Sequence, residues 1–189
     1  MPQPIHQQVL EFWFGAPRGP RLKRWFEKDA AFDAEVRGRF LPLYEEMVAG
    51  AHAQWLAEAE SCLARIVVLD QLPRNMFRGA PRAFAADPIA LETAHHALAA
   101  RYDRDRLPVE RLFFYLPFEH SESLEDQERA CELFRPLEAF PETHDAYRYA
   151  VAHRDIIARF GRFPHRNAIL GRESTPEEIA FLAQPGSGF

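Results

Sequence analysis

Arginine and histidine side chains that could bind an anion are concentrated in one stretch of this 189-residue chain, residues 159–172. This stretch, called here the basic turn, contains four arginines and one histidine together with two glycines and a proline. The chain as a whole is acidic, with a net charge of −5. We therefore expect the basic turn to meet either an acidic partner inside the fold or an anion outside it.

Two further groups of polar residues stand beside prolines and aromatic residues. We call them the Asp70 cluster, residues 70–78, and the Glu119 cluster, residues 119–122. Each of the three groups lies at the end of a predicted helix, next to aromatic side chains. Because a buried carboxylate or guanidinium is costly unless it is paired and hydrogen-bonded, such charges need partners. The three groups leave several interpretations open.

The first interpretation is an internal lattice of ion pairs that locks loops onto helices. Arginine suits this role because its planar guanidinium grips a carboxylate through two hydrogen bonds. The participants would be three carboxylates and four arginines: Asp70, Glu119, Glu122, Arg74, Arg78, Arg162 and Arg166. The polar groups would then be structural.

The second interpretation is a binding site for a small anionic ligand or for an acidic peptide end. The basic turn has four arginines and one acidic residue nearby, Glu173, so hydrogen-bond donors are left over. Phosphate or carboxylate would suit these donors. The residues predicted to bind the ligand are Asp70, Arg74, Asn75, Arg78, Glu122, Arg162, Arg166 and Asn167.

The third interpretation is catalysis by the same groups. Glu119 or Glu122 would act as general base, and His120 or His165 would move protons as acid or base. The arginines would stabilise developing negative charge. The matching reaction class is hydrolysis or transfer at a phosphate or acyl group. Glu119, His120 and His165 are the candidate catalytic residues.

A last alternative is a helical scaffold for a partner protein. Its function would lie on an exposed apolar groove, and the polar groups would only support the fold. We prefer the binding interpretation for the molecule as a whole, and leave open whether the protein is an enzyme.

Neither a metal nor an organic cofactor is expected. The candidate metal ligands have no diagnostic spacing and no HExxH motif; they are Glu119, His120, Glu122, His153 and His165. Among these, His153 lies on an apolar helix face, which favours a hydrogen-bonded core histidine. The chain also contains no GxGxxG, no P-loop and no GxSxG motif.

The hydrophobic pattern predicts helices throughout the chain. Apolar residues recur at helical spacing, and Gly161 is a natural end for the helix before the basic turn. Pro42 is expected to kink or split its helix, and Pro73 and Pro117 to end theirs. The expected helices span residues 5–15, 29–48, 58–72, 87–101, 108–116, 123–136, 143–161 or 145–161, and 175–183.

Several of these helices have recognisable N-caps. Asp87 precedes a proline, Ser123 precedes an amphipathic run, and Thr175 begins a capping box that Glu178 completes. No segment shows the alternation typical of a strand. We expect an all-α fold of roughly eight helices stacked as helical hairpins, in a single domain over residues 1–189.

Composition favours a cytoplasmic location. The acidic net charge argues against broad binding to nucleic acid or to anionic membranes. No stretch approaches the roughly 18–20 apolar residues of a membrane span, and residues 1–8 do not read as a signal peptide. Cys62 and Cys131 have no metal or redox spacing, so we expect buried free thiols.

Four long motifs lie at residues 11–15 (EFWFG), 69–79 (LDQLPRNMFRG), 116–122 (LPFEHSE) and 160–172 (FGRFPHRNAILGR). Together they resemble the motifs of the bacterial domain-of-unknown-function family 924. Leu72 departs from the family pattern, in which phenylalanine is more usual. The resemblance implies an all-helical fold akin to tetratricopeptide-like helix stacks. It implies no activity, so it assigns no catalytic residues.

Overall fold

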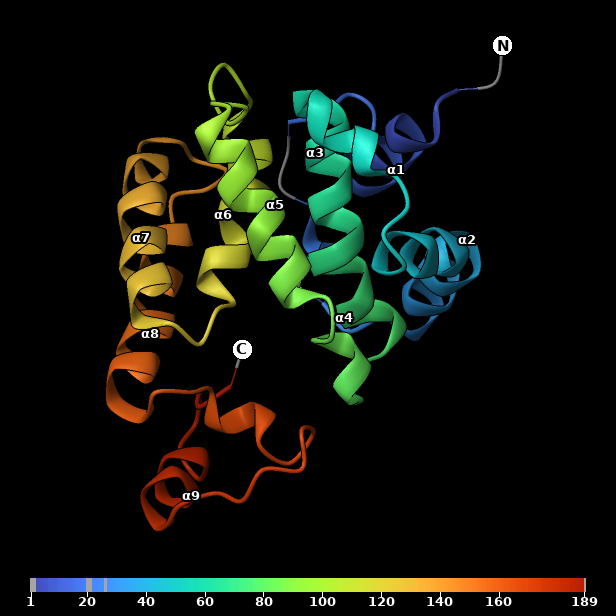
Figure 1. The fold of residues 1–189 in the computed structure, drawn as a ribbon. Coiled ribbons are helices and arrows are strands. Elements are labelled where there is room, and N and C mark those ends of the chain that lie inside the picture. Colours follow the sequence, from blue (N-terminus) through green and yellow to red (C-terminus); the bar gives the residue numbers. More distant parts are fainter. Residues whose placement is uncertain (1–2, 20–21, 26, 189) are drawn as a thin grey trace.

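The computed structural model describes residues 3–19, 22–25 and 27–188, and every regular element in these ranges is helical (Figure 1). The α-helices are α1 (Ile5–Phe14), α2 (Ala30–Val48), α3 (Ala59–Ile66), α4 (Leu72–Met76), α5 (Asp87–Ala99), α6 (Pro108–Glu119), α7 (Leu124–Phe134), α8 (Ala146–Phe160) and α9 (Pro176–Leu182). A π-helical turn, η3 (Val67–Gln71), joins α3 to α4 in one continuous rod. The all-α prediction is confirmed, whereas the likeness to tetratricopeptide stacking stays a prediction.

Helices that follow one another in sequence pack together in the second half of the body, whereas in the first half alternate helices do so. Helices α5, α6, α7 and α8 make a series of neighbours, while α1 packs on α3 and α2 on α4. In Figure 1, α9 and the segment before it lie below this body, at the end of α8. The C-terminal segment contacts the start of α5 through Arg166 and Asp87, and the loop after α6 through Arg172 and Glu122.

The main core is dominated by aromatic rings, and a smaller apolar cluster anchors the C-terminal segment. Trp25 and Phe113 meet edge to face with ring centroids 4.8 Å apart. The smaller cluster contains Ile156, Ile157 and the fully buried Phe163, with Phe160 and Phe181 packed against it. Burial of these side chains holds the basic turn against α8.

Three prolines lie inside helical stretches, which corrects the predicted breaks. Helix α2 continues through Pro42, and the Gly38 carbonyl that loses its helical donor lies on the exposed face, where water can reach it. Helix α6 continues through Pro117 because its C-terminal half is buried, so packing outweighs one lost hydrogen bond. Pro73 lies in the first turn of α4, where its missing N–H is tolerated.

The predicted end signals are mostly confirmed. Gly161 ends α8 in the left-handed conformation at φ 68°, and the Ser123 hydroxyl accepts a 3.5 Å bond from the backbone of α7. Thr175 and Glu178 form the capping box of α9. Asp87 is different: the N-cap position of α5 falls on Ala86, and the Asp87 carboxylate binds arginines instead.

Two smaller expectations concern the thiols and membrane spans. Cys62 and Cys131 are buried free cysteines, as predicted. Within the described ranges, no helix has both the length and the apolar character needed to cross a membrane. The predicted apolar residue Phe26 lies outside the described residues.

Candidate functional site

Asp70 stands at the centre of the polar network. It lies in the π-turn η3, where the Leu72 amide donates to the Val67 carbonyl across a wider ring than in an α-helix. Such turns insert one extra residue into a helix and are frequent at functional sites. Here the turn follows α3, most of whose residues are buried, and the Asp70 side chain is also fully buried.

Both oxygens of the Asp70 carboxylate have partners. Oδ1 accepts a 2.7 Å hydrogen bond from Nδ1 of His120 and lies 3.5 Å from Nη1 of Arg74. The Gln71 side-chain amide donates to Oδ2. Although burial raises the pKa of Asp70, the positive charge of Arg74 and the bond from His120 outweigh it, so the pKa lies well below its ordinary value. Asp70 is a buried anion held from three sides.

His120 presents one ring nitrogen to solvent. The residue caps the C-terminus of α6, and its side chain is 14% exposed. Because Nδ1 donates to Asp70, the lone pair is on Nε2, which has no protein partner among the described residues. Burial and the charge of Arg74 lower the pKa of His120, and Asp70 partly opposes them. The imidazole is therefore neutral at neutral pH.

Asp87 links two arginines from different parts of the chain. Arg74 binds both its oxygens, at 3.0 and 3.1 Å, in the fork geometry typical of strong pairs. Arg166, from the basic turn, lies 3.5 Å from Oδ2 of the same carboxylate. Asp87 therefore joins the Asp70 cluster to the basic turn, a role that its interpretation as an N-cap had hidden.

Arg166 is a buried cation with few bonds. Its side chain lies between two aromatic rings, 4.7 Å from the centroid of Phe84 and 4.5 Å from that of Phe163. The residue is only 7% exposed, and its buried Nε has no hydrogen-bond partner among the described residues. Burial and the neighbouring Arg74 lower the pKa of Arg166 to about 10. Among the described residues, the carboxylate that pairs with Arg166 is Asp87, at the long distance of 3.5 Å.

Glu119 is buried beside His153. Burial, followed by the charge of Asp70, raises the pKa of Glu119 to about 8, so the carboxyl group carries a proton at neutral pH. Oε1 lies 3.6 Å from Nδ1 of His153, which donates to the Tyr149 carbonyl at 2.8 Å. The prediction of a hydrogen-bonded core histidine is thus confirmed. Burial lowers the pKa of His153 to about 3 and, together with Arg166, that of His165 to about 4.

The remaining predicted carboxylate, Glu122, fastens the Glu119 cluster to the basic turn. It accepts hydrogen bonds from Arg172 at 2.7 and 3.0 Å and from the Phe163 backbone at 2.8 Å. Arg172 also donates to the side chain of Asn167 at 3.0 Å. Glu122 and Asn167 are therefore part of an ion-pair lattice, as the first interpretation predicts, but with Arg172 as the cation.

Three other predicted binding residues bind carboxylates other than Asp70. Arg162 grips Glu178 with two bonds of 2.7 and 2.8 Å. Arg78 grips Asp33 at 2.7 and 2.8 Å, and Asn75 donates to the same carboxylate at 2.8 Å. The expected pairing of these arginines with Asp70, Glu119 or Glu122 is corrected accordingly.

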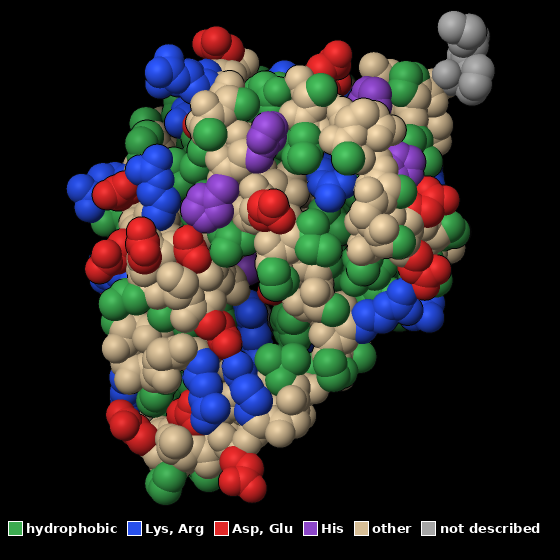
Figure 2. Space-filling view, viewed as in Figure 1, with side chains coloured by type: hydrophobic (Ala, Val, Ile, Leu, Met, Phe, Trp, Pro, Cys, Tyr) green, Lys and Arg blue, Asp and Glu red, His purple; other side chains and the backbone are tan. Residues whose placement is uncertain are grey.

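The surface is hollowed where the three polar groups converge. Figure 2 shows a hollow near the middle of this face, with histidine, acidic and basic side chains visible in its depth. Comparison with Figure 1 places it between the ends of α5 and α6 and the C-terminal segment. More basic side chains gather on its lower margin, over that segment.

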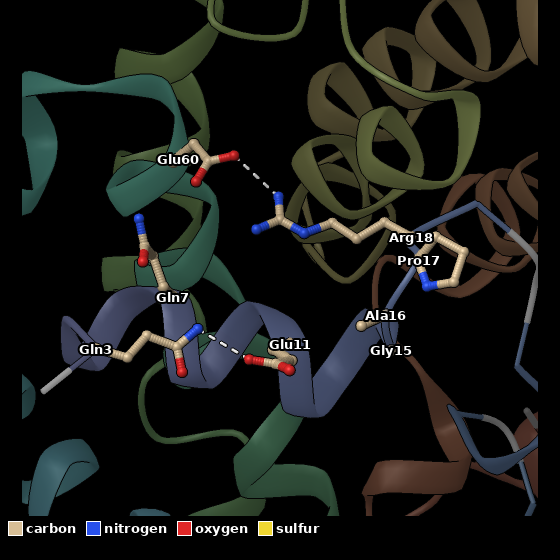
Figure 3. A pocket seen from close by; sticks show the side chains of 8 residues that line it. All are labelled: Gln3, Gln7, Glu11, Gly15, Ala16, Pro17, Arg18 and Glu60. Carbon is tan, nitrogen blue, oxygen red and sulfur yellow. Dashed lines mark hydrogen bonds and ion pairs between the residues drawn. The ribbon is translucent and has the colours of Figure 1, made fainter.

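Two other cavities lie elsewhere. One, of about 280 Å³, lies beside α1; Figure 3 shows Gln3 bonded to Glu11 and Arg18 reaching Glu60 across it. Nη1 of Arg18 pairs there with Glu60 and Glu110, at 3.0 and 2.9 Å. The other, of about 410 Å³, lies between α5 and α7, and four of its eight lining residues are acidic. Among the described residues, there is no group of three or more His, Cys, Asp or Glu side chains that could hold a metal ion.

Comparison with known proteins agrees with the family resemblance of the sequence motifs. The family model DUF924, described as a bacterial protein of unknown function, matches residues 9–186. The chain belongs to this family. It is also similar to a solved structure, a protein of unknown function, ATU0120, from Agrobacterium tumefaciens. The two chains are 42% identical, the match covers 95% of this chain and 97% of the other, and the TM-score is 0.86. No curated protein matches the chain.

Proposed function

We propose that this DUF924 protein binds a small oxyanion, a phosphate or a carboxylate, in the hollow where the three polar groups meet. The observation that carries the proposal is Arg166. A guanidinium has five N–H donors, and this one is almost completely buried with a single long contact to a carboxylate. Burying a cation in this state is costly unless an anion completes its bonding.

The distribution of charge around Arg166 supports the same conclusion. The acceptor that it shares, Asp87, is already bound through both oxygens by Arg74. The nearby Asp70 is occupied by His120 and Gln71, and Glu119 is protonated at neutral pH. The neighbouring carboxylates are thus occupied or neutral, so an added oxyanion would supply the missing acceptors.

The aromatic rings prepare Arg166 for binding. The rings of Phe84 and Phe163 both lie against its guanidinium, so the N–H groups that point away from the rings are the ones left for hydrogen bonds. A side chain held this way loses little rotational freedom when a ligand binds. Arg78 and Arg162 serve a structural role in this proposal, because each already binds a carboxylate with two bonds.

A thermal-shift titration tests the proposal. The protein is heated with inorganic phosphate, acetate, dicarboxylates or acidic peptides, as wild type and as Arg166→Gln. A ligand at one hundred times its Kd adds about 2.7 kcal/mol, or roughly 5–10 °C for a chain of this size. We expect the shift in the wild type and its loss in Arg166→Gln.

The matched control is Arg162→Gln, which removes an arginine of the same turn that Glu178 already binds. This variant should keep the ligand-induced shift, even if its melting temperature is lower. Equal shifts in all three proteins would place the anion elsewhere. No shift in a folded wild type with any oxyanion would leave the ion-pair lattice as the role of these residues.

A further inference from the structure

The Asp70–His120 pair points to more than binding. Resting on the proposed anion site, we propose that Nε2 of His120 is a nucleophile that accepts a phosphoryl group from a small phosphate monoester or acyl phosphate. The protein would then catalyse phosphoryl transfer through a phosphohistidine intermediate, with water as the final acceptor.

The orientation of His120 carries the proposal. A neutral imidazole has one nitrogen that donates and one that accepts, and the bond to Asp70 assigns the proton to Nδ1. Nε2 therefore keeps its lone pair on the side where the described residues supply no partner. Asp70 cannot turn away, because Gln71 and Arg74 hold it as well.

The buried charge of Asp70 also suits the intermediate. Phosphorylation at Nε2 leaves the imidazole ring positively charged, with a proton still on Nδ1. An anion 2.7 Å from that nitrogen stabilises this charge, and it does so in surroundings where electrostatic interactions are strong.

Other side chains of the three polar groups are less suited to attack phosphorus. The Ser121 hydroxyl donates to Asp126 at 2.7 Å, away from Asp70. Arginines remain protonated and have no lone pair to offer. The thiols are excluded by burial, which raises the pKa of Cys62 to about 12 and also raises that of Cys131. His120 is the residue with an oriented, solvent-facing lone pair.

The neighbouring groups supply the other parts of the reaction. Arg166 lies at the far end of the chain of contacts that runs from His120 through Asp70, Arg74 and Asp87. Its N–H groups without carboxylate partners stabilise the phosphoryl oxygens during transfer. Arg74 already binds both oxygens of Asp87, so it holds the network in place.

The two steps balance as follows. Nε2 attacks phosphorus and forms the N–P bond, the P–O bond to the leaving group breaks, and the leaving oxygen takes a proton from solvent. Water then attacks phosphorus, the N–P bond breaks, and the proton released by water returns to solvent. The products are an alcohol, or a carboxylic acid from an acyl phosphate, and inorganic phosphate.

Intact-mass spectrometry of the full chain provides the test. The protein is incubated with acetyl phosphate near neutral pH and quenched in base, where phosphohistidine survives. We expect a gain of one phosphoryl group that is lost in acid and that peptide mapping locates at His120. His120→Asn keeps an amide that can donate to Asp70 but removes Nε2, so its mass gain should disappear.

A second histidine provides the matched control. His95 also lies near an aspartate, with Nε2 3.5 Å from Asp126, but its side chain is 58% exposed on another face of α5. His95→Asn should be phosphorylated like the wild type. A phosphoryl group found on His95, or one retained in His120→Asn, would overturn the inference.

The outcome also separates this inference from the binding proposal. A folded wild type that is stabilised by inorganic phosphate in an Arg166-dependent way, but gains no mass from acetyl phosphate, overturns the nucleophile and keeps the binding site. A protein that neither gains mass nor responds to phosphate or any other oxyanion overturns both. Phosphorylation at His120 that falls at least tenfold in Arg166→Gln supports both.

Discussion

The carboxylate of Asp70 lies 2.7 Å from Nδ1 of His120, although fifty positions separate the two residues in sequence. A π-turn in one helical rod and the last turn of α6 bring them together. The pair joins the Asp70 and Glu119 clusters, and Asp87 connects it to the basic turn through Arg74 and Arg166. The three polar groups therefore form one network.

Removing the central carboxylate should destabilise the whole domain. Asp70→Ala leaves Gln71 and the His120 donor without their acceptor inside the protein, and it uncovers part of the charge of Arg74. Breaking a buried pair in this way costs about 3–5 kcal/mol. Urea unfolding followed by circular dichroism measures the loss.

The control for this change is an exposed pair. Asp155 lies next to Arg154 with its side chain 61% exposed, and such pairs contribute about 0–1 kcal/mol. Asp155→Ala should therefore unfold at nearly the wild-type urea concentration. If Asp70→Ala behaved in the same way, the network would not stabilise the fold.

Glu119 should make the free energy of unfolding fall as pH rises from 4.5 towards about 8. Its folded-state pKa of about 8 lies above the ordinary 4.5, so the folded protein holds this proton more tightly than the unfolded chain does. The stability due to Glu119 is fully present below pH 4.5 and is lost as pH rises towards 8, on the order of 1.4 kcal/mol per pH unit. Glu119→Gln, which imitates the neutral acid, should gain on the wild type over this interval.

Urea unfolding of both proteins at several pH values between about 5 and 8.5 checks this sign, because the loss of stability is expected between pH 4.5 and about 8. Subtracting the variant from the wild type removes the groups that titrate in both. A difference that stays constant across the interval would mean that Glu119 is ionised in the folded protein.

His153 should act in the opposite direction, in acid. Its folded-state pKa of about 3 lies below the ordinary 6.5, so the unfolded chain binds this proton first. The stability due to the neutral ring is present above pH 6.5 and is lost as pH falls towards 3, again about 1.4 kcal/mol per pH unit. His153→Gln should flatten the acid side of a plot of unfolding free energy against pH.

The exposed His96 supplies a comparison, since its ring bonds to the Leu56 carbonyl at the surface. His96→Gln should leave the slope of the acid side as in the wild type. If both substitutions changed the slope equally, the buried ring of His153 would not be the cause of the acid dependence.

Arg172 should hold the basic turn closed without determining global stability. It binds Glu122 through two bonds and donates to the Phe163 carbonyl at 3.0 Å. Hydrogen bonds to charged groups of this kind contribute roughly 1.5–3 kcal/mol. Arg172→Gln should therefore increase amide exchange in residues 161–175 while α3 and α6 exchange as before. Uniformly faster exchange would instead show that the turn and the core open together.

The sequence predicts the local features of this fold well. The left-handed Gly161, the hydroxyl cap at Ser123 and the capping box at Thr175 depend on neighbouring residues, and the structure confirms each one. The grouping of charges beside aromatic residues likewise marks the three segments that converge. These signals depend on residues that are close in sequence, so they can be identified without knowledge of the tertiary fold.

What the sequence cannot supply is the pairing between helices. Pro73 and Pro117 resemble helix ends, but a π-turn in one case and complete burial in the other let the helix continue. Asp87 looks like a cap, yet it binds two arginines, one of them 79 positions away. Phe84 gives no sequence signal at all, because its role depends on where Arg166 arrives.

Phe84 leads to the last prediction. Its ring covers one face of the Arg166 guanidinium, so Phe84→Leu keeps apolar volume but removes the cation–π contact and loosens the arginine. Such contacts contribute about 0.5–2 kcal/mol, which corresponds to roughly a 2- to 30-fold weaker affinity for the bound oxyanion. Isothermal titration with the oxyanion found by thermal shift measures the change. Phe160→Leu is the control, since its ring lies 4.6 Å from a different arginine, Arg159, which binds Glu177. An affinity unaffected by Phe84→Leu would mean that Arg166 does not hold the anion from between the two rings.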